Sequence, residues 1–147
     1  DSVPFYGLPS NRIETENLVV SGYGWSLEGF KEKGTAYANR GYHWVEVPEN
    51  LKKGWQYTRM SGGKFSELSV EAKQAVTLQV FTEYKQKTFD LSGWTKVEGW
   101  QFRYTDKNRT LMQVYQRKLE AGQKLYVPQG NWTGCMLLLP EDKVRKK

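Results

Sequence analysis

The chain has 147 residues, the size of one ordinary domain, and we expect a single domain over residues 1–147 whose ends, about 1–12 and 141–147, are loosely held. Charged residues make up 26% and aromatic residues 14% of the chain, a composition that argues against disorder. The longest apolar run, residues 135–139, is far shorter than the roughly 18 residues of a membrane-spanning helix, so no membrane span is expected.

The net charge of +6 is spread along the chain. It comes without a basic stripe, a zinc-finger spacing or a helix-turn-helix pattern, so nucleic acid is not expected as a partner. A solvated surface with a basic tail explains most of this charge, and a weak attraction for an anionic polymer stays open.

In chain order, short runs that alternate apolar and polar residues predict strands. The first lies in residues 13–20, an extended segment covers 34–48 and ends at Pro48, and a further strand covers 54–60. Residues 27–34 are one of only two helix candidates. The other, residues 66–75, is better explained as strands.

The second half of the chain predicts two hairpins. Residues 64–84 form the first, with a bend near 71–74, and the second joins 96–104 to 111–119. The turn between the latter two strands contains Asp106 and Asn108, whose side chains suit turns. The last strands are expected at 123–128 and 132–140. The spacing predicts an all-β, two-sheet antiparallel β-sandwich, of jelly-roll or immunoglobulin-like type, with little helix.

Gly-Trp pairs recur along the chain and mark a turn followed by a strand, because glycine permits the turn and tryptophan favours the strand. The tryptophans of these pairs are Trp25, Trp55, Trp94 and Trp100.

Residues that could support catalysis are scarce. Cys135, the only cysteine, lies in an apolar run and is interpreted as a core residue, and His43 has no surrounding nucleophile or metal motif. Glu98 could pair with Asp106 or Asp90 as glycosidase carboxylates, but all three are expected to be solvated acids in turns or at strand ends. We therefore expect no enzyme, no cofactor and no metal, and a structural calcium ion is not supported.

Four stretches carry a resemblance to a known group of domains: GTAYANRGYHWVEVPENLKKGWQYTRM, LSVEAKQAVTLQVFTEY, LSGWTKV and MQVYQRKLEAGQKLYVPQG. Together, over about residues 34–130, they resemble the β-sandwich accessory domains of secreted bacterial polysaccharide-degrading enzymes. That resemblance implies an extracellular or cell-surface module beside a catalytic domain. The family often has an aspartate and an arginine where this chain has Glu83 and Lys85, so no binding residue is carried over.

The resemblance assigns one set of residues to the core. These fall where the family pattern places apolar side chains: Tyr42, Trp44, Val76, Leu78, Trp94 and Tyr115.

Trp25, Trp100 and Trp132 fall outside that pattern and are the candidates for an exposed sugar-binding platform, each equally compatible with a partly buried strand position. A pyranose ring packs its C–H face on an indole while its hydroxyl groups need polar partners, a role that Asn131 and Arg103 could fill. The expected function is carbohydrate (polysaccharide) binding by a non-catalytic module. The alternative is a structural or protein-interaction sandwich that packs against a neighbouring domain. Asn108 and Asn131 also head N-x-Thr sequons, which a eukaryotic secretory pathway would glycosylate.

Overall fold

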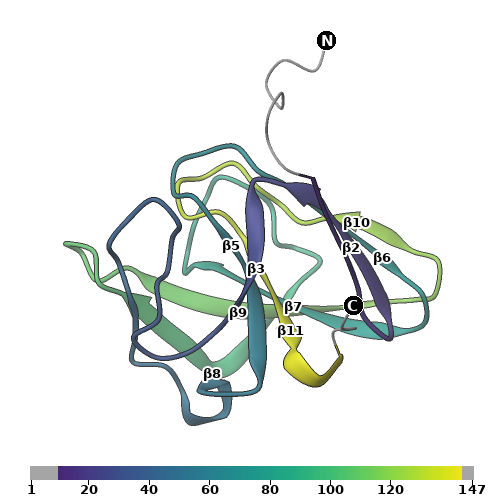
Figure 1. Cartoon of the computed structure of the whole chain (residues 1–147), viewed down its shortest axis with the longest axis horizontal. Helices are drawn as coiled ribbons and strands as arrows, with labels where there is room; N and C mark the ends of the chain where they lie inside the picture. Colours follow the sequence, from purple (N-terminus) through teal and green to yellow (C-terminus); the bar gives the residue numbers. More distant parts are fainter. Residues whose placement is uncertain (1–9, 144–147) are drawn as a thin grey trace.

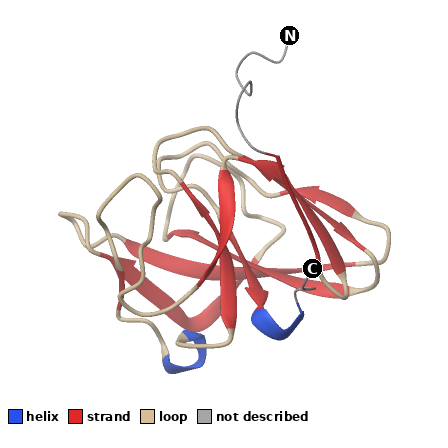
Figure 2. Ribbon diagram, in the orientation of Figure 1, coloured by secondary structure: helices blue, strands red, loops and turns tan. Residues whose placement is uncertain are grey.

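The computed structural model describes residues 10–143, which form an all-β, two-sheet antiparallel structure (Figure 2). The predicted fold class is therefore confirmed. The eleven strands are β1 (Ser10–Glu14), β2 (Leu18–Tyr23), β3 (Trp25–Gly29), β4 (Trp44–Val45), β5 (Trp55–Met60), β6 (Glu67–Ala72), β7 (Val76–Glu83), β8 (Thr95–Tyr104), β9 (Leu111–Leu119), β10 (Lys124–Tyr126) and β11 (Met136–Pro140). The only helical segments within residues 10–143 are two 3-10 turns, Glu49–Leu51 and Glu141–Lys143, and no helix in this range could cross a membrane.

Four strands form the smaller sheet in the order β1-β2-β6-β10 (Figure 1). The other seven form a larger sheet in the order β3-β5-β11-β7-β9-β8-β4, which curls into a half-barrel. Every pairing between neighbouring strands in both sheets is antiparallel. The chain passes from the smaller sheet to the larger one between β2 and β3, and from the larger sheet to the smaller one between β5 and β6.

At this boundary, where β2 and β3 pair with β6 and β5, the chain between β5 and β6 contains an insertion. Trp25 pairs with Met60 in the larger sheet, and Tyr23 pairs with Glu67 in the smaller one. Gly24 alone, with a φ of 86°, therefore lies opposite six residues, 61–66. A positive φ of this size suits glycine, and the excess residues leave the ladder as a loop.

Aromatic rings fill the core of the larger sheet. Trp44, which is fully buried, contacts Phe81 and Phe102 edge to face, with ring centroids 5.3 and 5.2 Å away. Phe30 and Tyr57 complete the cluster. Such edge-to-face pairs add about 0.5–1.5 kcal/mol each to the effect of burial, so this cluster is a main source of stability.

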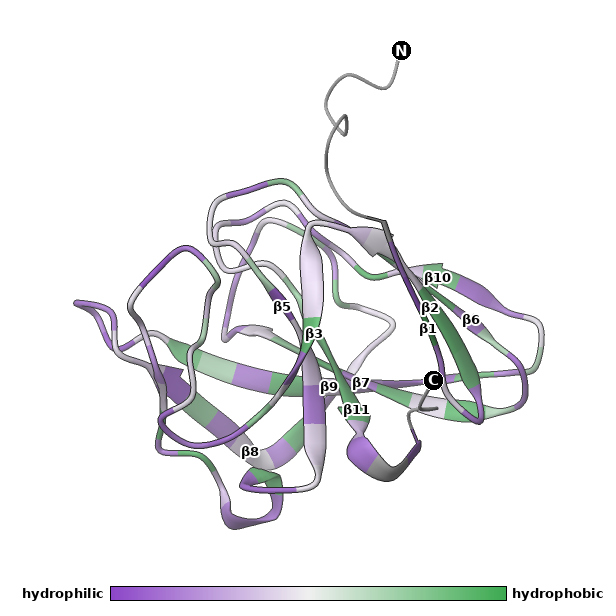
Figure 3. Ribbon diagram, in the orientation of Figure 1, coloured by the Kyte–Doolittle hydropathy of each residue, from purple (hydrophilic) through white to green (hydrophobic). Residues whose placement is uncertain are grey.

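Aliphatic side chains line the inner face of the smaller sheet. In β6, Leu68, Val70 and Ala72 are buried while Ser69 and Glu71 alternate with them toward the outside, which gives the alternating colours of Figure 3. A cavity of about 220 Å³ beside the 3-10 turn Glu141–Lys143 is lined by residues of both sheets, so the inner faces of the two sheets meet there.

The predicted hairpin over residues 96–119 is confirmed, since β8 and β9 pair on either side of the turn. The predicted hairpin over residues 64–84 is wrong, because β6 pairs with β2 and β10 whereas β7 lies between β11 and β9. The reason is burial: Val80 and Phe81, which point to opposite faces, are both fully buried, so β7 needs a position covered on both faces, whereas the outer face of the smaller sheet carries the exposed Glu71. Residues 27–34 form β3 and a turn instead of a helix.

The core assignments agree with the observed burial. Trp44, Leu78 and Trp94 are buried, whereas Tyr42, Val76 and Tyr115 are half-buried against the core. The Gly-Trp interpretation is confirmed most directly at Trp25 and Trp55, which open β3 and β5. Glycines with positive φ, Gly24 and Gly54, precede these two tryptophans.

The predicted loose ends fall mainly on residues 1–9 and 144–147, which lie outside the described range. Residues 10–12, also expected to be loose, instead pair with β2.

Candidate functional site

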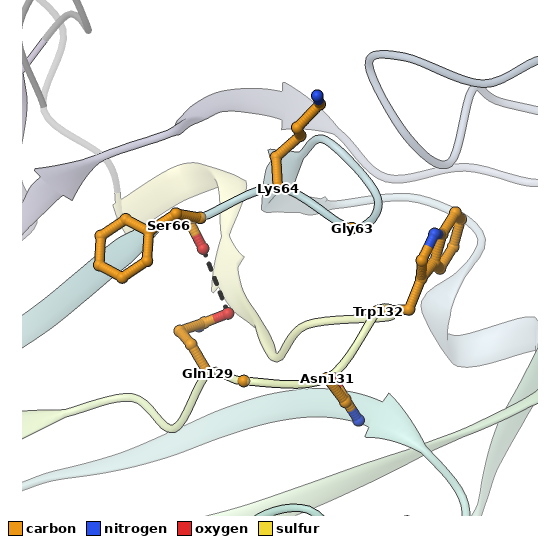
Figure 4. A pocket seen from close by; sticks show the side chains of 8 residues that line it. Gly63, Lys64, Ser66, Gln129, Asn131 and Trp132 are labelled. Carbon is orange, nitrogen blue, oxygen red and sulfur yellow. Dashed lines mark hydrogen bonds between the residues drawn. The ribbon is translucent and has the colours of Figure 1, made fainter. Parts of the chain in front are cut away.

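A groove of about 530 Å³ opens where the inserted loop 61–66 meets the loop between β10 and β11. Its lining is mixed, with two aromatic side chains, one ammonium group, two amides and one hydroxyl. The lining residues are Gly63, Lys64, Phe65, Ser66, Gln129, Gly130, Asn131 and Trp132. Ser66 and Gln129 lie together across from Trp132 (Figure 4).

The two aromatic side chains of the groove are both exposed to solvent. Within the described residues, the large apolar side chains that are exposed are Phe65 at 61%, Tyr126 at 72% and Trp132 at 37%. Two of these three lie in the groove. The Phe65 ring also stacks on Tyr23 at a centroid distance of 5.9 Å, so the aromatic surface continues onto β2.

Trp132 is held from several sides. The Tyr37 ring lies 5.0 Å from it and the Tyr104 ring is stacked at 6.3 Å. Added Cβ atoms at Gly62 and Gly63 would come within 2.4 and 2.9 Å of the indole, so the backbone of the inserted loop packs directly against it. Only a residue without a side chain permits this approach.

Hydrogen bonds fix the loops that carry the groove. The Asn39 amide donates to Gly62 O at 3.0 Å and accepts from Gly62 N at 2.8 Å, and Gly63 N donates to Trp132 O at 3.1 Å. The Tyr37 hydroxyl donates to Thr133 O at 2.8 Å. The segment before β4, the inserted loop and the β10–β11 loop are thus joined by hydrogen bonds to main-chain groups.

Two polar side chains of the groove already make hydrogen bonds within the protein. Ser66 Oγ donates to Gln129 Oε1 at 3.2 Å, and Gln129 Nε2 donates to Cys135 O at 2.9 Å. The Ser66 oxygen keeps its acceptor capacity, and the Gln129 amide keeps one N–H. Ser66 itself is buried, so the Gln129 amide and the ammonium of Lys64 are what the groove offers to a ligand's hydroxyl or acidic groups.

Burial decides the ionisation of the groups behind the groove. It raises the pKa of Tyr37 well above its ordinary value and that of Tyr104 to about 12. It also raises the pKa of the Cys135 thiol, which is fully buried as a core residue should be. The cysteine is therefore a packing element and not a reactive thiolate at neutral pH.

The structure brings two of the five predicted site residues to the groove, Trp132 and Asn131. The Asn131 side chain is directed away from the groove (Figure 4), and its Oδ1 accepts from Gly134 N at 2.7 Å. Asn131 therefore shapes the loop as an Asx turn does and does not offer its amide to a ligand, which corrects the predicted role.

The other three candidates lie elsewhere. Trp25 is only 5% exposed and donates its indole N–H to Glu67 O at 2.9 Å, so the expectation that it forms an exposed platform is wrong. Trp100 is half-buried with its ring 5.8 Å from that of Trp55. Arg103 pairs with Glu46 at 3.5 Å and points to the opposite face of β8 from Tyr104.

Sequence reasoning missed the other six lining residues, which are Gly63, Lys64, Phe65, Ser66, Gln129 and Gly130. Phe65 was placed in a strand, although the preceding Ser-Gly-Gly is a loop signal that could have moved it into a turn. Gln129 had no signal of its own, since its role depends on contacts across the loops.

The candidate acids are engaged in local structure. Glu98 pairs with Lys96 at 3.2 Å, and the Asp106 carboxylate accepts from Thr110 N at 2.7 Å and from its hydroxyl. Asp90 likewise accepts from Ser92 N at 2.8 Å. His43 is exposed on the chain before β4, next to the buried Trp44.

No carboxylate lines the groove, and within residues 10–143 no three His, Cys, Asp or Glu side chains gather in a manner that could hold a metal ion. Comparisons with protein-family models, with curated proteins and with solved structures find no match to this chain.

Proposed function

We propose that this chain is a non-catalytic carbohydrate-binding module that holds a polysaccharide in the groove between Phe65 and Trp132. The observation that supports the proposal is that exposed aromatic side chains lie in one groove with the Gln129 amide, which the buried Ser66 holds through a hydrogen bond. A sugar needs this combination, because its C–H face packs on an aromatic ring while its hydroxyl groups exchange hydrogen bonds.

The preformed loops favour the proposal further. The walls are joined by Asn39, Gly62 and Gly63, so a ligand does not have to order them on binding. A module of this kind, working outside the cell beside a polysaccharide-degrading enzyme, would raise the enzyme's effective concentration at its substrate.

Protein binding is the second candidate, and Tyr126 is the observation in its favour. It is 72% exposed on the outer face of the smaller sheet, away from the groove. Protein interfaces are enriched in tyrosine at their centre. The three exposed large apolar side chains do not gather in one place, however, whereas a docking patch usually covers several hundred Å² of continuous surface.

A polysaccharide screen with variants tests the proposal. The chain is titrated with neutral and acidic polysaccharides by calorimetry, and Phe65→Ala and Trp132→Ala are each expected to weaken binding by about 1–2 kcal/mol. Tyr126→Ala is the matched control, because it removes an exposed aromatic ring outside the groove, and it should bind like the unmodified chain. If no polysaccharide binds, or if only Tyr126→Ala weakens binding, the groove is not a carbohydrate site.

A further inference from the structure

Two positive side chains lie at the groove. Lys64 lines it, extending from the inserted loop (Figure 4). Arg40, on the segment before β4, does not line the groove but contacts one of its lining residues, because its guanidinium carbon lies 5.5 Å from the centroid of the Trp132 ring. At this distance the guanidinium is attracted to the face of the indole, so one cation is placed directly at the aromatic part of the groove.

Hydrogen bonds to main-chain groups fix the two loops that carry these cations. Asn39, the neighbour of Arg40, makes two hydrogen bonds with Gly62, and Gly63, the neighbour of Lys64, donates to Trp132 O. Arg40 also donates through Nη1 to Asn39 O at 3.0 Å. The Arg40 guanidinium therefore lies over the indole of Trp132, and the backbone that carries Lys64 is fixed beside the same residue.

Among the described residues, these charges have no acidic partner. Seven ion pairs join side chains within residues 10–143, and none of them includes Lys64 or Arg40. The groove lining also contains no aspartate or glutamate. An uncompensated positive potential in a hollow attracts anionic ligands and accelerates their association.

We infer that the groove selects acidic polysaccharides, that is, sugars bearing carboxylate or sulfate groups. This inference rests on the proposed function and adds the class of ligand to it. The planar guanidinium of Arg40 can stay on the indole while its outer N–H groups donate to an acidic group, and Lys64 supplies a second, more mobile charge. The sugar carrying that group then lies against Phe65 and Trp132.

The test uses the whole chain and two charge-neutralised double variants. Lys64→Gln with Arg40→Gln removes both charges at the groove. The control variant, Lys118→Gln with Lys124→Gln, removes two charges from exposed lysines near the end of β9 and at the start of β10. Its net charge therefore changes by the same amount as that of the groove variant. Both are first checked for unchanged thermal unfolding.

The probes are polygalacturonate and alginate as carboxylated polymers, dextran sulfate as a sulfated one, and xylan and mixed-linkage glucan as neutral ones. At least one acidic polymer is expected to bind more tightly than both neutral polymers, and its charge type identifies the acidic group. Neutralising Lys64 and Arg40 should lower that affinity roughly 2- to 30-fold and weaken its dependence on salt. The control variant should keep the affinity within about twofold.

Three results would overturn the inference. The first is that neutral polymers bind as tightly as acidic ones. The second is that the groove variant binds acidic polymers as tightly as the control variant does. The third is that a single-stranded DNA oligomer binds more tightly than every polysaccharide. A neutral polymer that binds and is lost in Phe65→Ala would overturn the charge preference alone and leave the proposed function in place. Failure of every polysaccharide to bind would overturn both.

Discussion

Replacing Gly62 with alanine tests the close packing of the inserted loop against Trp132. A Cβ at this buried position would lie 2.4 Å from Trp132 Cη2, about 1.1 Å inside the shortest ordinary carbon–carbon contact of about 3.5 Å. The indole has little room to retreat because Tyr37 and Tyr104 pack against it, and the Gly62 backbone is held by Asn39. We expect the free energy of unfolding to fall by about 1–3 kcal/mol, the usual range for overpacking.

Urea unfolding monitored by circular dichroism measures this change. Gly41→Ala is the control, since a Cβ there meets nothing within 4 Å, and its stability should change by no more than about 0.5–1 kcal/mol. If the steric contact is the cause, the effect of Gly62→Ala must largely disappear when Trp132 is also replaced by alanine. An equal loss of stability with and without the indole would refute the reasoning.

Three further predictions concern the core, the pH and the surface. Trp44→Ala should lower the free energy of unfolding by about 3–5 kcal/mol in the same urea assay, because it empties the centre of the aromatic cluster, and a loss below 1 kcal/mol would contradict that role. Burial raises the pKa of Tyr37 and Tyr104, so at high pH the folded state keeps protons that the unfolded state releases. The contribution of these groups to stability is therefore complete below about pH 10 and should fall as the pH rises toward 12. Urea midpoints and tyrosinate absorbance measure this change. If the chain is secreted from eukaryotic cells, mass spectrometry should find a glycan on Asn108, which is exposed in the β8–β9 turn, and none on Asn131, whose amide nitrogen is buried.

The strands were predictable because their signals are local. In β6 the alternation of Leu68, Val70 and Ala72 with polar residues fixes both the strand and its buried face. The β8–β9 hairpin has a turn residue, Asp106, whose carboxylate accepts the hydrogen bonds that close the turn.

The distribution of the strands between two sheets was not predictable from such signals. The short link 73–75 looks like a hairpin turn, yet it carries the chain from one sheet to the other. Only the need to bury both faces of β7 decides between these outcomes, and that depends on partners far away in sequence.

The site was predictable only in part, for a related reason. Trp132 was identified because it follows a polar, glycine-containing loop, and the groove contains it. Trp25 has equally polar neighbours in sequence, but the register of β3 turns its ring inward, toward Glu67 O. The inserted loop itself is visible only when Gly24 is known to face residues 61–66, which is a property of pairing and not of composition.

The two aromatic residues of the groove differ in a way that determines how binding can be measured. Trp132 packs against Tyr37, Tyr104 and the Gly62 backbone, so its removal changes stability and binding together. Phe65 is 61% exposed, so its removal takes away contact surface with little loss of buried core. A binding defect in Phe65→Ala with unchanged unfolding therefore reports on the ligand contact alone. The same defect in Trp132→Ala can be assigned to contact only after the loss of stability has been measured.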